Sequence, residues 1–323
     1  MALSTDLSRI AFIGLGAMGL PMATNLVAAG FDVRGYDLRP EGRAALATAG
    51  GTSIATPAEA AAGADALLLM VVNAAQAEAV LFTEGALDAL APDGLVVLMA
   101  TCPPQSVERL AGRGAAAGRR FVDAPVSGGV VGARAGTLTI MAAAPAGTLA
   151  ALRPVLDALG DRIFQVGERP GQGATVKAVN QLLCGVHIAA AAEALALAGR
   201  VGVDLDVVLE ILSGSSAASW MLRDRGPRML EDAPTVTSAV DIFVKDLGIV
   251  LEAGRGAGAA LPLAALAHQL FVSTSGRGDG AADDSQVVRA YRLLNGDDAP
   301  PSARPSAQSS ARDARHRGST APD

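Results

Sequence analysis

A lysine on a predicted apolar helix is the side chain in this sequence best suited to proton transfer. At 3.6 residues per turn, four side chains share one face of residues 176–199: Lys177, Asn180, Gln181 and Cys184. The other positions are almost wholly apolar, which is typical of a buried helix. A buried amine is costly without a partner or a function. Two interpretations therefore stand: Lys177 takes part in chemistry, or its stem snorkels along a linker helix.

The scarcity of lysine favours the chemical interpretation. Lys177 and Lys245 are the two lysines among 26 basic residues, so the other 24 are arginines. Arginine does not deprotonate in proteins, whereas a desolvated lysine does. The two lysines therefore indicate sites where an ammonium group is needed. For Lys245 the alternative is an i,i+4 pair with Asp241 on an exposed helix, which contributes little to stability.

The composition excludes several classes of protein. Half of the 323 residues are apolar, the net charge is −6 and aromatic residues make up 3%, so nucleic-acid binding is not expected. Cys102 and Cys184 indicate free thiols in a reducing compartment. Residues 1–9 lack a signal-peptide pattern, and the apolar run 10–15 is too short to span a bilayer. We therefore expect a cytoplasmic protein that has no membrane partner and, since no His/Cys/Asp cluster has metal-ligand spacing, no metal.

A glycine pattern near the N-terminus predicts a dinucleotide-binding turn after a buried strand at residues 9–15. The pattern consists of six residues: Gly14, Leu15, Gly16, Ala17, Met18 and Gly19. In such a G-x-G-x-x-G turn the glycines permit the tight turn, the approach of a pyrophosphate and close packing of helix on strand. A helix over 21–29, whose N-terminus would face the phosphates, and a strand over 31–36 complete the unit. The alternatives are an S-adenosylmethionine-binding turn and a purely structural one.

An acidic residue at the end of the second strand indicates which dinucleotide binds. Asp37 lies where a carboxylate accepts hydrogen bonds from the adenosine ribose hydroxyls. Its charge would repel a 2′-phosphate, so the sequence favours NAD over NADP. Arg39 weakens this preference, because an arginine at that place could bind a 2′-phosphate.

Strands and helices alternate as far as residue 166. The further predicted strands are 64–72, 94–99, 120–123, 137–142 and 162–166. This alternation predicts an α/β fold with a doubly wound, largely parallel sheet, in an NAD-binding domain of residues 1–170. Ligands lie at the carboxyl ends of such strands, which makes Asn73, Thr101 and Ser127 candidates for the site. The alternative is ordinary turn chemistry, since these residue types favour strand ends.

From residue 176 onward the pattern is helical. The predicted helices are 176–201, 204–212, 219–229, 240–257, 262–274 and 285–294. We expect an all-α domain of residues 171–296 for substrate binding and oligomerisation, joined to the first domain by the helix that carries Lys177. Its alanine-rich, sparsely charged faces suggest a buried interface between subunits. Residues 297–323 lack apolar periodicity and are expected to be a disordered tail.

Four stretches occur in a specific order along the chain. They are the glycine pattern at 13–19, Asp-Ala-Pro-Val-Ser-Gly-Gly at 123–129 with the glycines at 132 and 136, the segment 171–180, and Phe-Val-Lys-Asp-Leu at 243–247. Together they resemble the β-hydroxyacid dehydrogenases, the family of 3-hydroxyisobutyrate dehydrogenase and tartronate semialdehyde reductase, over residues 9–292. One departure is Gln181, where an asparagine commonly follows Asn180 in the family, and we expect it to reshape the substrate pocket.

The resemblance implies an NAD-dependent oxidoreductase acting on the CH–OH group of a small hydroxyacid. L-threonate is the favoured substrate, and 3-hydroxyisobutyrate or glycerate with tartronate semialdehyde are alternatives. Lys177 would be the general acid/base, because burial and a neighbouring cationic nicotinamide disfavour its charged form. A catalytically silent dinucleotide-binding module is a remoter alternative, which the presence of Lys177 argues against. The family also suggests a homodimer or homotetramer.

The resemblance further implies which residues would contact the two ligands. The substrate would contact Ser127, Gly128, Gly129, Asn180 and Gln181. The cofactor would contact residues 14–19 of the glycine pattern together with Asp37, Val72, Asn73, Thr101 and Lys245.

Overall fold

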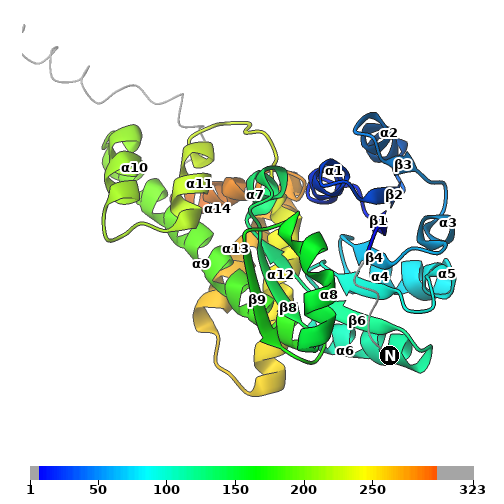
Figure 1. The fold of residues 1–323 in the computed structure, drawn as a ribbon. Coiled ribbons are helices and arrows are strands. Elements are labelled where there is room, and N and C mark those ends of the chain that lie inside the picture. The colour runs from blue at the N-terminus through cyan, green and yellow to red at the C-terminus, as the bar shows by residue number, and fades with distance from the viewer. Residues whose placement is uncertain (1–6, 297–323) are drawn as a thin grey trace, which may run out of the picture. The chain divides into compact units, whose positions relative to one another are not determined.

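A nine-stranded sheet forms the core of the N-terminal part of the protein, whose residues 7–296 are described by the computed structural model (Figure 1). Its strands are β1 (Arg9–Ile13), β2 (Asp32–Tyr36), β3 (Thr52–Ser53), β4 (Ala66–Leu69), β5 (Leu95–Leu98), β6 (Arg120–Asp123), β7 (Val126–Ser127), β8 (Thr139–Ala143) and β9 (Arg162–Gly167). Their order is β3-β2-β1-β4-β5-β6-β8-β7, with β9 paired to β8. The pairs from β3 to β6 are parallel, whereas β8 runs antiparallel to β6 and β7. The predicted doubly wound, largely parallel sheet is therefore confirmed.

Helices connect these strands. They are α1 (Gly19–Ala28), α2 (Pro40–Thr48), α3 (Pro57–Ala61), α4 (Ala74–Glu78), the π-helical η1 (Ala79–Thr83), α5 (Ala86–Ala89), α6 (Pro104–Ala116), α7 (Gly129–Ala135) and α8 (Ala146–Asp157). Several of them begin at a proline or just after one, where the missing N–H leaves no intrahelical bond unmade.

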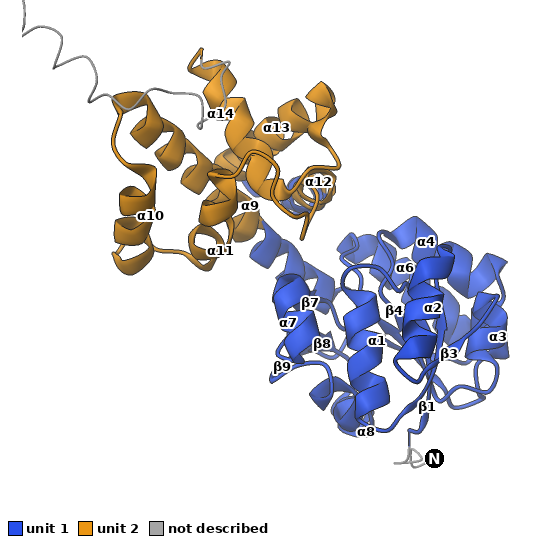
Figure 2. Cartoon of the chain, turned by 90° about the horizontal axis from the view of Figure 1, so that it is seen from above, with its two compact units in different colours: residues 1–181, 249–260 blue, residues 182–248, 261–323 orange. Residues whose placement is uncertain are grey.

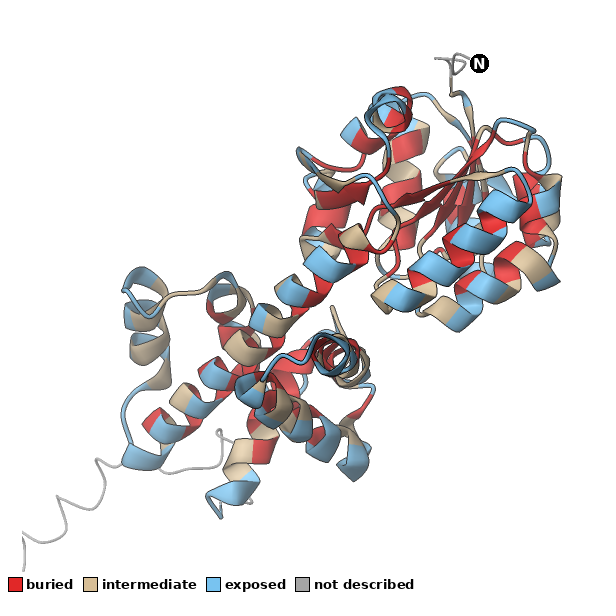
Figure 3. Cartoon of the chain, turned by 90° about the horizontal axis from the view of Figure 1, so that it is seen from below, coloured by how far each residue is buried: buried red, intermediate tan, exposed pale blue. Residues whose placement is uncertain are grey.

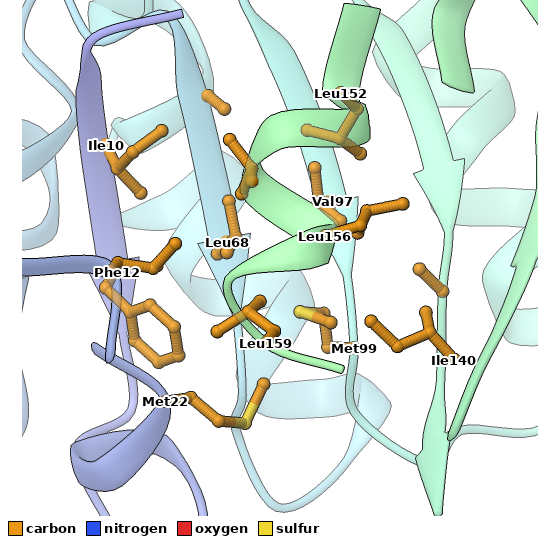
Figure 4. Close-up of a cluster of buried hydrophobic side chains, with 14 of the residues drawn as sticks. Ile10, Phe12, Met22, Leu68, Val97, Met99, Ile140, Leu152, Leu156 and Leu159 are labelled. Carbon is orange, nitrogen blue, oxygen red and sulfur yellow. The ribbon is translucent and has the colours of Figure 1, made fainter. Parts of the chain in front are cut away.

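Both faces of the sheet are buried, which explains why the strands are continuous apolar runs. Along β1, Ile10 and Phe12 enter one hydrophobic cluster and Ala11 and Ile13 enter the other. The first cluster also holds side chains of α1 and α8, and Figure 4 shows them against β1, β4, β5 and β8. The second holds side chains of α3 and α6. In Figure 3 the strands are accordingly coloured as buried, and the outer helices carry exposed residues.

The C-terminal part is helical, as predicted. Its elements are α9 (Gln172–Val201), α10 (Leu205–Gly214), α11 (Trp220–Met229), α12 (Val240–Ala257), α13 (Pro262–Thr274), η2 (Ser275–Asp279), η3 (Asp284–Val287) and α14 (Val288–Leu294). The chain folds as two compact units, Met1–Gln181 with Ile249–Ala260 and Leu182–Gly248 with Leu261–Asp323 (Figure 2). Helices α9 and α12 each contribute to both units. The predicted domain boundary at residue 170 stays a prediction, and the predicted tail 297–323 lies outside the described residues.

Helix α9 is the longest apolar element of the described chain. By length and composition it could cross a membrane, yet half of its most apolar stretch is buried inside the protein. It also carries a buried lysine and a buried glutamine, Lys177 and Gln181. These features are those of a helix that packs in a protein core.

Candidate active site

The glycine turn between β1 and α1 has two glycines that the fold itself requires. Gly14 has φ +96°, and a Cβ on it would lie 2.4 Å from the carbonyl oxygen of Met70. A Cβ on Gly19 would lie 1.8 Å from the carbonyl oxygen of Gly14. Gly16 differs, because a Cβ there would meet only the Arg39 guanidinium, at 3.4 Å. The space above Gly16 is therefore not needed for packing, and it fits the approach of a ligand to the backbone.

A cavity of about 830 Å³ lies beside this turn. It is lined by Leu15, Gly16 and Ala17 of the turn, by α1 and α2, and by the two guanidinium groups of Arg39 and Arg134. Met18 is the residue that precedes α1. Cationic groups beside a helix N-terminus are suited to the phosphates of a dinucleotide. The residues present thus fit the cofactor that the sequence predicts.

Asp37 connects the end of β2 to the glycine turn. Its Oδ2 accepts a hydrogen bond from the backbone N–H of Leu15 at 2.8 Å, and its Oδ1 accepts one from the N–H of Arg39 at 2.8 Å. The side chain is 12% exposed. Oδ1 also accepts a longer hydrogen bond from Arg39 Nε, at 3.4 Å. A carboxylate oxygen offers about two acceptor positions, so Oδ2 is the oxygen that retains room for a ribose hydroxyl. Asp37 therefore has a structural role, fixing the turn, which spacing alone did not reveal.

Two of the three strand-end candidates, Asn73 and Thr101, follow neighbouring strands of the sheet, whereas Ser127 ends β7 at the far end of the strand order. Asn73 follows β4 and Thr101 follows β5, and β4 lies between β1 and β5, so both are at the edge that carries the glycine turn. The Asn73 side chain accepts the N–H of Gln76 at 2.9 Å and caps α4. Gln76 in turn accepts the N–H of Val72 at 2.8 Å. Turn chemistry thus accounts for one contact of Asn73. Cofactor binding stays a prediction for Val72, Asn73 and Thr101.

The predicted lysine face of α9 is formed. Lys177 is 6% exposed and Gln181 is 7% exposed. The Lys177 ammonium donates a hydrogen bond to Oε1 of Gln181 at 2.7 Å, and the Asn180 amide donates to the same oxygen at 2.9 Å. Two polar side chains therefore donate to one oxygen atom of a third, Gln181. Gln181, predicted as a substrate contact, also holds the lysine.

The turn after β7 contains two consecutive glycines with positive φ. Gly128 has φ +130° and Gly129 has φ +61°. A Cβ on Gly129 would meet no atom within 4 Å, whereas one on Gly128 would lie 3.2 Å from Leu138. Ser127 is half-buried at the end of β7. Consecutive backbone amides in such a turn can form an anion-binding concavity, which suits the predicted carboxylate site.

Asp123 was not predicted as a site residue. In the structure it is 1% exposed and directs its carboxylate at the start of α9. Its Oδ2 accepts the backbone N–H of Gly171 at 2.8 Å and that of Ala174 at 2.9 Å. Burial raises the pKa of the Asp123 carboxyl to about 6, although these N–H groups oppose the shift. The contacts join segments 48 and 51 residues apart, so no local spacing could have revealed them.

Lys245 lies on α12 and pairs with its neighbour. Its ammonium is 2.9 Å from Oδ1 of Asp246, and its side chain is 25% exposed. The alternative partner from the sequence, Asp241, instead accepts a hydrogen bond from Ser275 at 2.6 Å. A contact between Lys245 and the cofactor stays a prediction.

Comparison with known proteins covers both parts of the chain. Residues 9–167 match the NAD binding domain of 6-phosphogluconate dehydrogenase, and residues 171–291 match the family model described as NAD-binding of NADP-dependent 3-hydroxyisobutyrate dehydrogenase. The chain is 47% identical over 284 residues to L-threonate dehydrogenase of Cupriavidus necator, covering 88% of this chain and 96% of that protein. It is 40% identical over 285 residues to L-threonate dehydrogenase of Escherichia coli K12, covering 88% and 94%.

A solved structure shows the same fold. The crystal structure of 3-hydroxyisobutyrate dehydrogenase from Salmonella typhimurium aligns with a TM-score of 0.83 and 39% identity. The alignment covers 87% of this chain and 99% of that one. The likeness thus extends through both the sheet and the helical part.

Replacing Asp37 by alanine should weaken the preference for NAD. The variant loses charge-assisted hydrogen bonds to the ribose and the repulsion toward a 2′-phosphate. The ratio of kcat/KM for NAD to kcat/KM for NADP should therefore fall about 10- to 100-fold. Steady-state kinetics with both dinucleotides measures this ratio. Asp32→Ala is the matched control, because Asp32 begins the same strand and pairs with exposed Arg9. An unchanged ratio in Asp37→Ala would show that Asp37 does not discriminate between the cofactors.

The raised pKa of Asp123 predicts a pH-dependent contribution to stability. A carboxyl whose pKa is higher in the folded state stabilises fully below its unfolded value of 3.8, and this contribution is lost as pH rises through about 6. Between pH 5 and pH 8 the wild type should therefore lose about 1 kcal/mol more unfolding free energy than Asp123→Asn, which cannot titrate. Urea denaturation of both proteins at the two pH values measures the difference. Equal losses would contradict a raised pKa.

Proposed function

Because the chain belongs to the β-hydroxyacid dehydrogenase family that includes 3-hydroxyisobutyrate dehydrogenase, we propose that it oxidises L-threonate to 2-oxo-tetronate with NAD. NAD-dependent oxidation of a CH–OH group is the activity of this family. The relatives named L-threonate dehydrogenase, at 47% and 40% identity over nearly their whole length, support this substrate. The buried ammonium of Lys177, held by Gln181, is the single observation that carries the proposed chemistry.

Lys177 is the proposed general acid/base. Oxidation of an alcohol removes a hydride from carbon and a proton from the hydroxyl, and the proton needs an acceptor. A neutral Lys177 accepts it, and the resulting ammonium donates it back in the reverse reaction. The hydrogen bond from Nζ to Gln181 Oε1 fixes the amine in one direction in either protonation state.

The remaining polar groups orient the substrate. Asn180, one turn beyond Lys177, holds a substrate oxygen through its amide and fixes the reacting carbon. Ser127, Gly128 and Gly129 bind the carboxylate through a hydroxyl and backbone amides. Both sets lie within the first compact unit.

The glycine turn, Asp37 and the cavity beside Gly16 would hold NAD, and the groups after β4 and β5 would contact it further along the strand ends. Bound NAD supplies the acceptor for the hydride. Asp37 favours NAD, while Arg39, 67% exposed and 3.4 Å from Asp37 Oδ1, is already paired with that carboxylate. This pairing turns the Arg39 guanidinium to Asp37 and so supports NAD rather than NADP.

The second candidate substrate is 3-hydroxyisobutyrate, supported by the solved structure that aligns over 87% of this chain. A third is glycerate with tartronate semialdehyde. Gln181 favours L-threonate over both, because its longer side chain replaces the common asparagine and turns its oxygen to Lys177 and Asn180. The pocket of this chain therefore differs from that of the simplest family members.

We also propose a homodimer or homotetramer in the cytoplasm. Helix α10 has no buried residue, and its apolar side chains Val207 and Ile211 are more than half exposed. Leu197 and Val201 of α9 are likewise exposed, at 62% and 65%. Exposed apolar side chains on helices are suited to a subunit interface. Sedimentation velocity tests the proposal, and a monomer at micromolar concentration would contradict it.

NADH formation with a panel of acids tests the substrate. The purified protein should reduce NAD with L-threonate at a kcat/KM at least about 10-fold above that for D-threonate, L-serine, 3-hydroxyisobutyrate or glycerate, since one well-placed hydroxyl contributes about 1.4 kcal/mol or more. Absorbance at the NADH band measures each rate. A kcat/KM for 3-hydroxyisobutyrate above that for L-threonate would show that 3-hydroxyisobutyrate is the substrate instead. Absence of turnover with every acid, together with tight NAD binding, would instead support a non-catalytic module.

A further inference from the structure

We propose that Asp123 is a positioning residue that holds the first turn of α9 and thereby sets the place of the Lys177 ammonium. This inference rests on the proposed role of Lys177 as general acid/base. Asp123 does not act on the substrate itself. It acts through the helix that carries the lysine.

The contact is a helix cap supplied from a distant strand. The first N–H groups of a helix have no partner within it, and a cap normally comes from the residue just before the helix. Here Asp123, the last residue of β6, accepts the N–H groups of Gly171 and Ala174 on one oxygen. The carboxylate therefore ties the start of α9 to the sheet.

The helix start packs closely against its surroundings at this cap. A Cβ on Gly173 would lie 2.6 Å from the carbonyl oxygen of Met141 and 2.7 Å from that of Asp123. Gly171 has φ +95°, and a Cβ on it would lie 2.8 Å from the Glu108 side chain. The backbone of the first turn thus lies directly against β6 and β8, as close as glycine permits.

Lys177 follows within one turn of the capped residue. Ala174 and Lys177 are three positions apart on the helix, which places them on neighbouring turns of one side. The far end of the lysine is fixed by Gln181, one further turn along. A shift of the first turn would therefore move the ammonium together with its acceptor, because both belong to the same helix.

The same aspartate also fixes the relation of this helix to the proposed carboxylate site. Only three residues separate Asp123 from Ser127, and the segment between them is buried. Asp123 is thus the point where the strand leading to the Ser127 turn and the helix bearing Lys177 are joined by hydrogen bonds. A proton acceptor misplaced by about 1 Å can cost about 100-fold in rate.

Kinetics of three variants test the proposal. Asp123→Ala removes both acceptors and should lower kcat with L-threonate about 100-fold, while the Kd for NADH, measured by fluorescence, stays within about 2-fold. Asp123→Asn keeps an acceptor oxygen and should retain kcat within about 5-fold of wild type, since Asn and Asp cap helices about equally. Asp204→Ala is the matched control, because Asp204 caps α10 by accepting the N–H groups of Asp206 and Val207. It should leave kcat unchanged.

Lysine acylation gives a second readout of position. The chain has two lysines, so mass spectrometry after treatment with an N-hydroxysuccinimide ester reports Lys177 against Lys245 as an internal reference. Asp123→Ala should raise the labelling of Lys177 relative to Lys245, and Asp204→Ala should not. Asp123→Ser, whose shorter hydroxyl accepts more weakly, replaces the alanine variant if that protein does not fold, and it should show the same rise with an intermediate kcat.

Wild-type kcat in Asp123→Ala, or equal impairment of Asp123→Asn and Asp123→Ala, would overturn the proposal. Labelling of Lys177 that does not change in any Asp123 variant would overturn it as well. Full activity in Lys177→Ala would instead remove the proposed function of the lysine, whatever the Asp123 variants show. The two failures are therefore distinguishable.

Discussion

The amine of Lys177 is almost out of contact with water, and an isolated charge in such a place is strongly disfavoured. Its hydrogen bond to Gln181 offsets part of that cost, and the i,i+4 spacing on α9 makes the bond possible. Everything that fixes α9 therefore also fixes the amine. The glycines at its start allow close contact with the sheet, and Asp123 supplies the cap that the chain just before the helix does not.

Much of the fold could be predicted because its signals are local. The bounds of β6, α12 and α13 agree with the prediction residue for residue, since each has a clear apolar pattern with a defined start or end. The short helices α2, α3 and α7 and the strand β3 were not predicted. The three helices are rich in alanine or glycine, and all four elements are too short for a clear periodic pattern. Helix α4 continues directly into a π-helical turn, η1, and the amino-acid composition of this segment does not indicate such a turn.

The candidate site divides in the same way. The glycine turn and the lysine face follow from spacing, and both are present as predicted. The second roles of Asp37 and Gln181, and the whole role of Asp123, depend on which backbone or side chain lies opposite in the folded chain. Contacts across 48 residues or between adjacent strands are set by the topology of the fold. The sequence therefore indicates the residues but not the groups that they contact. The scarcity of lysine, by contrast, is visible in the sequence alone, and it predicts a special role for Lys177 on α9.

Chemical rescue of Lys177→Ala tests the central claim most directly. The variant should lose at least about 100-fold in kcat for L-threonate oxidation, because general acid/base groups contribute about 100- to 10,000-fold. Added methylamine should restore part of the rate in proportion to its unprotonated fraction, since a free amine then takes the hydroxyl proton. Lys177→Arg should be inactive and not rescued to the same extent, because a guanidinium does not release its proton and fills the space. Wild-type turnover in Lys177→Ala without added amine would contradict the assignment of Lys177 as the group that moves the proton.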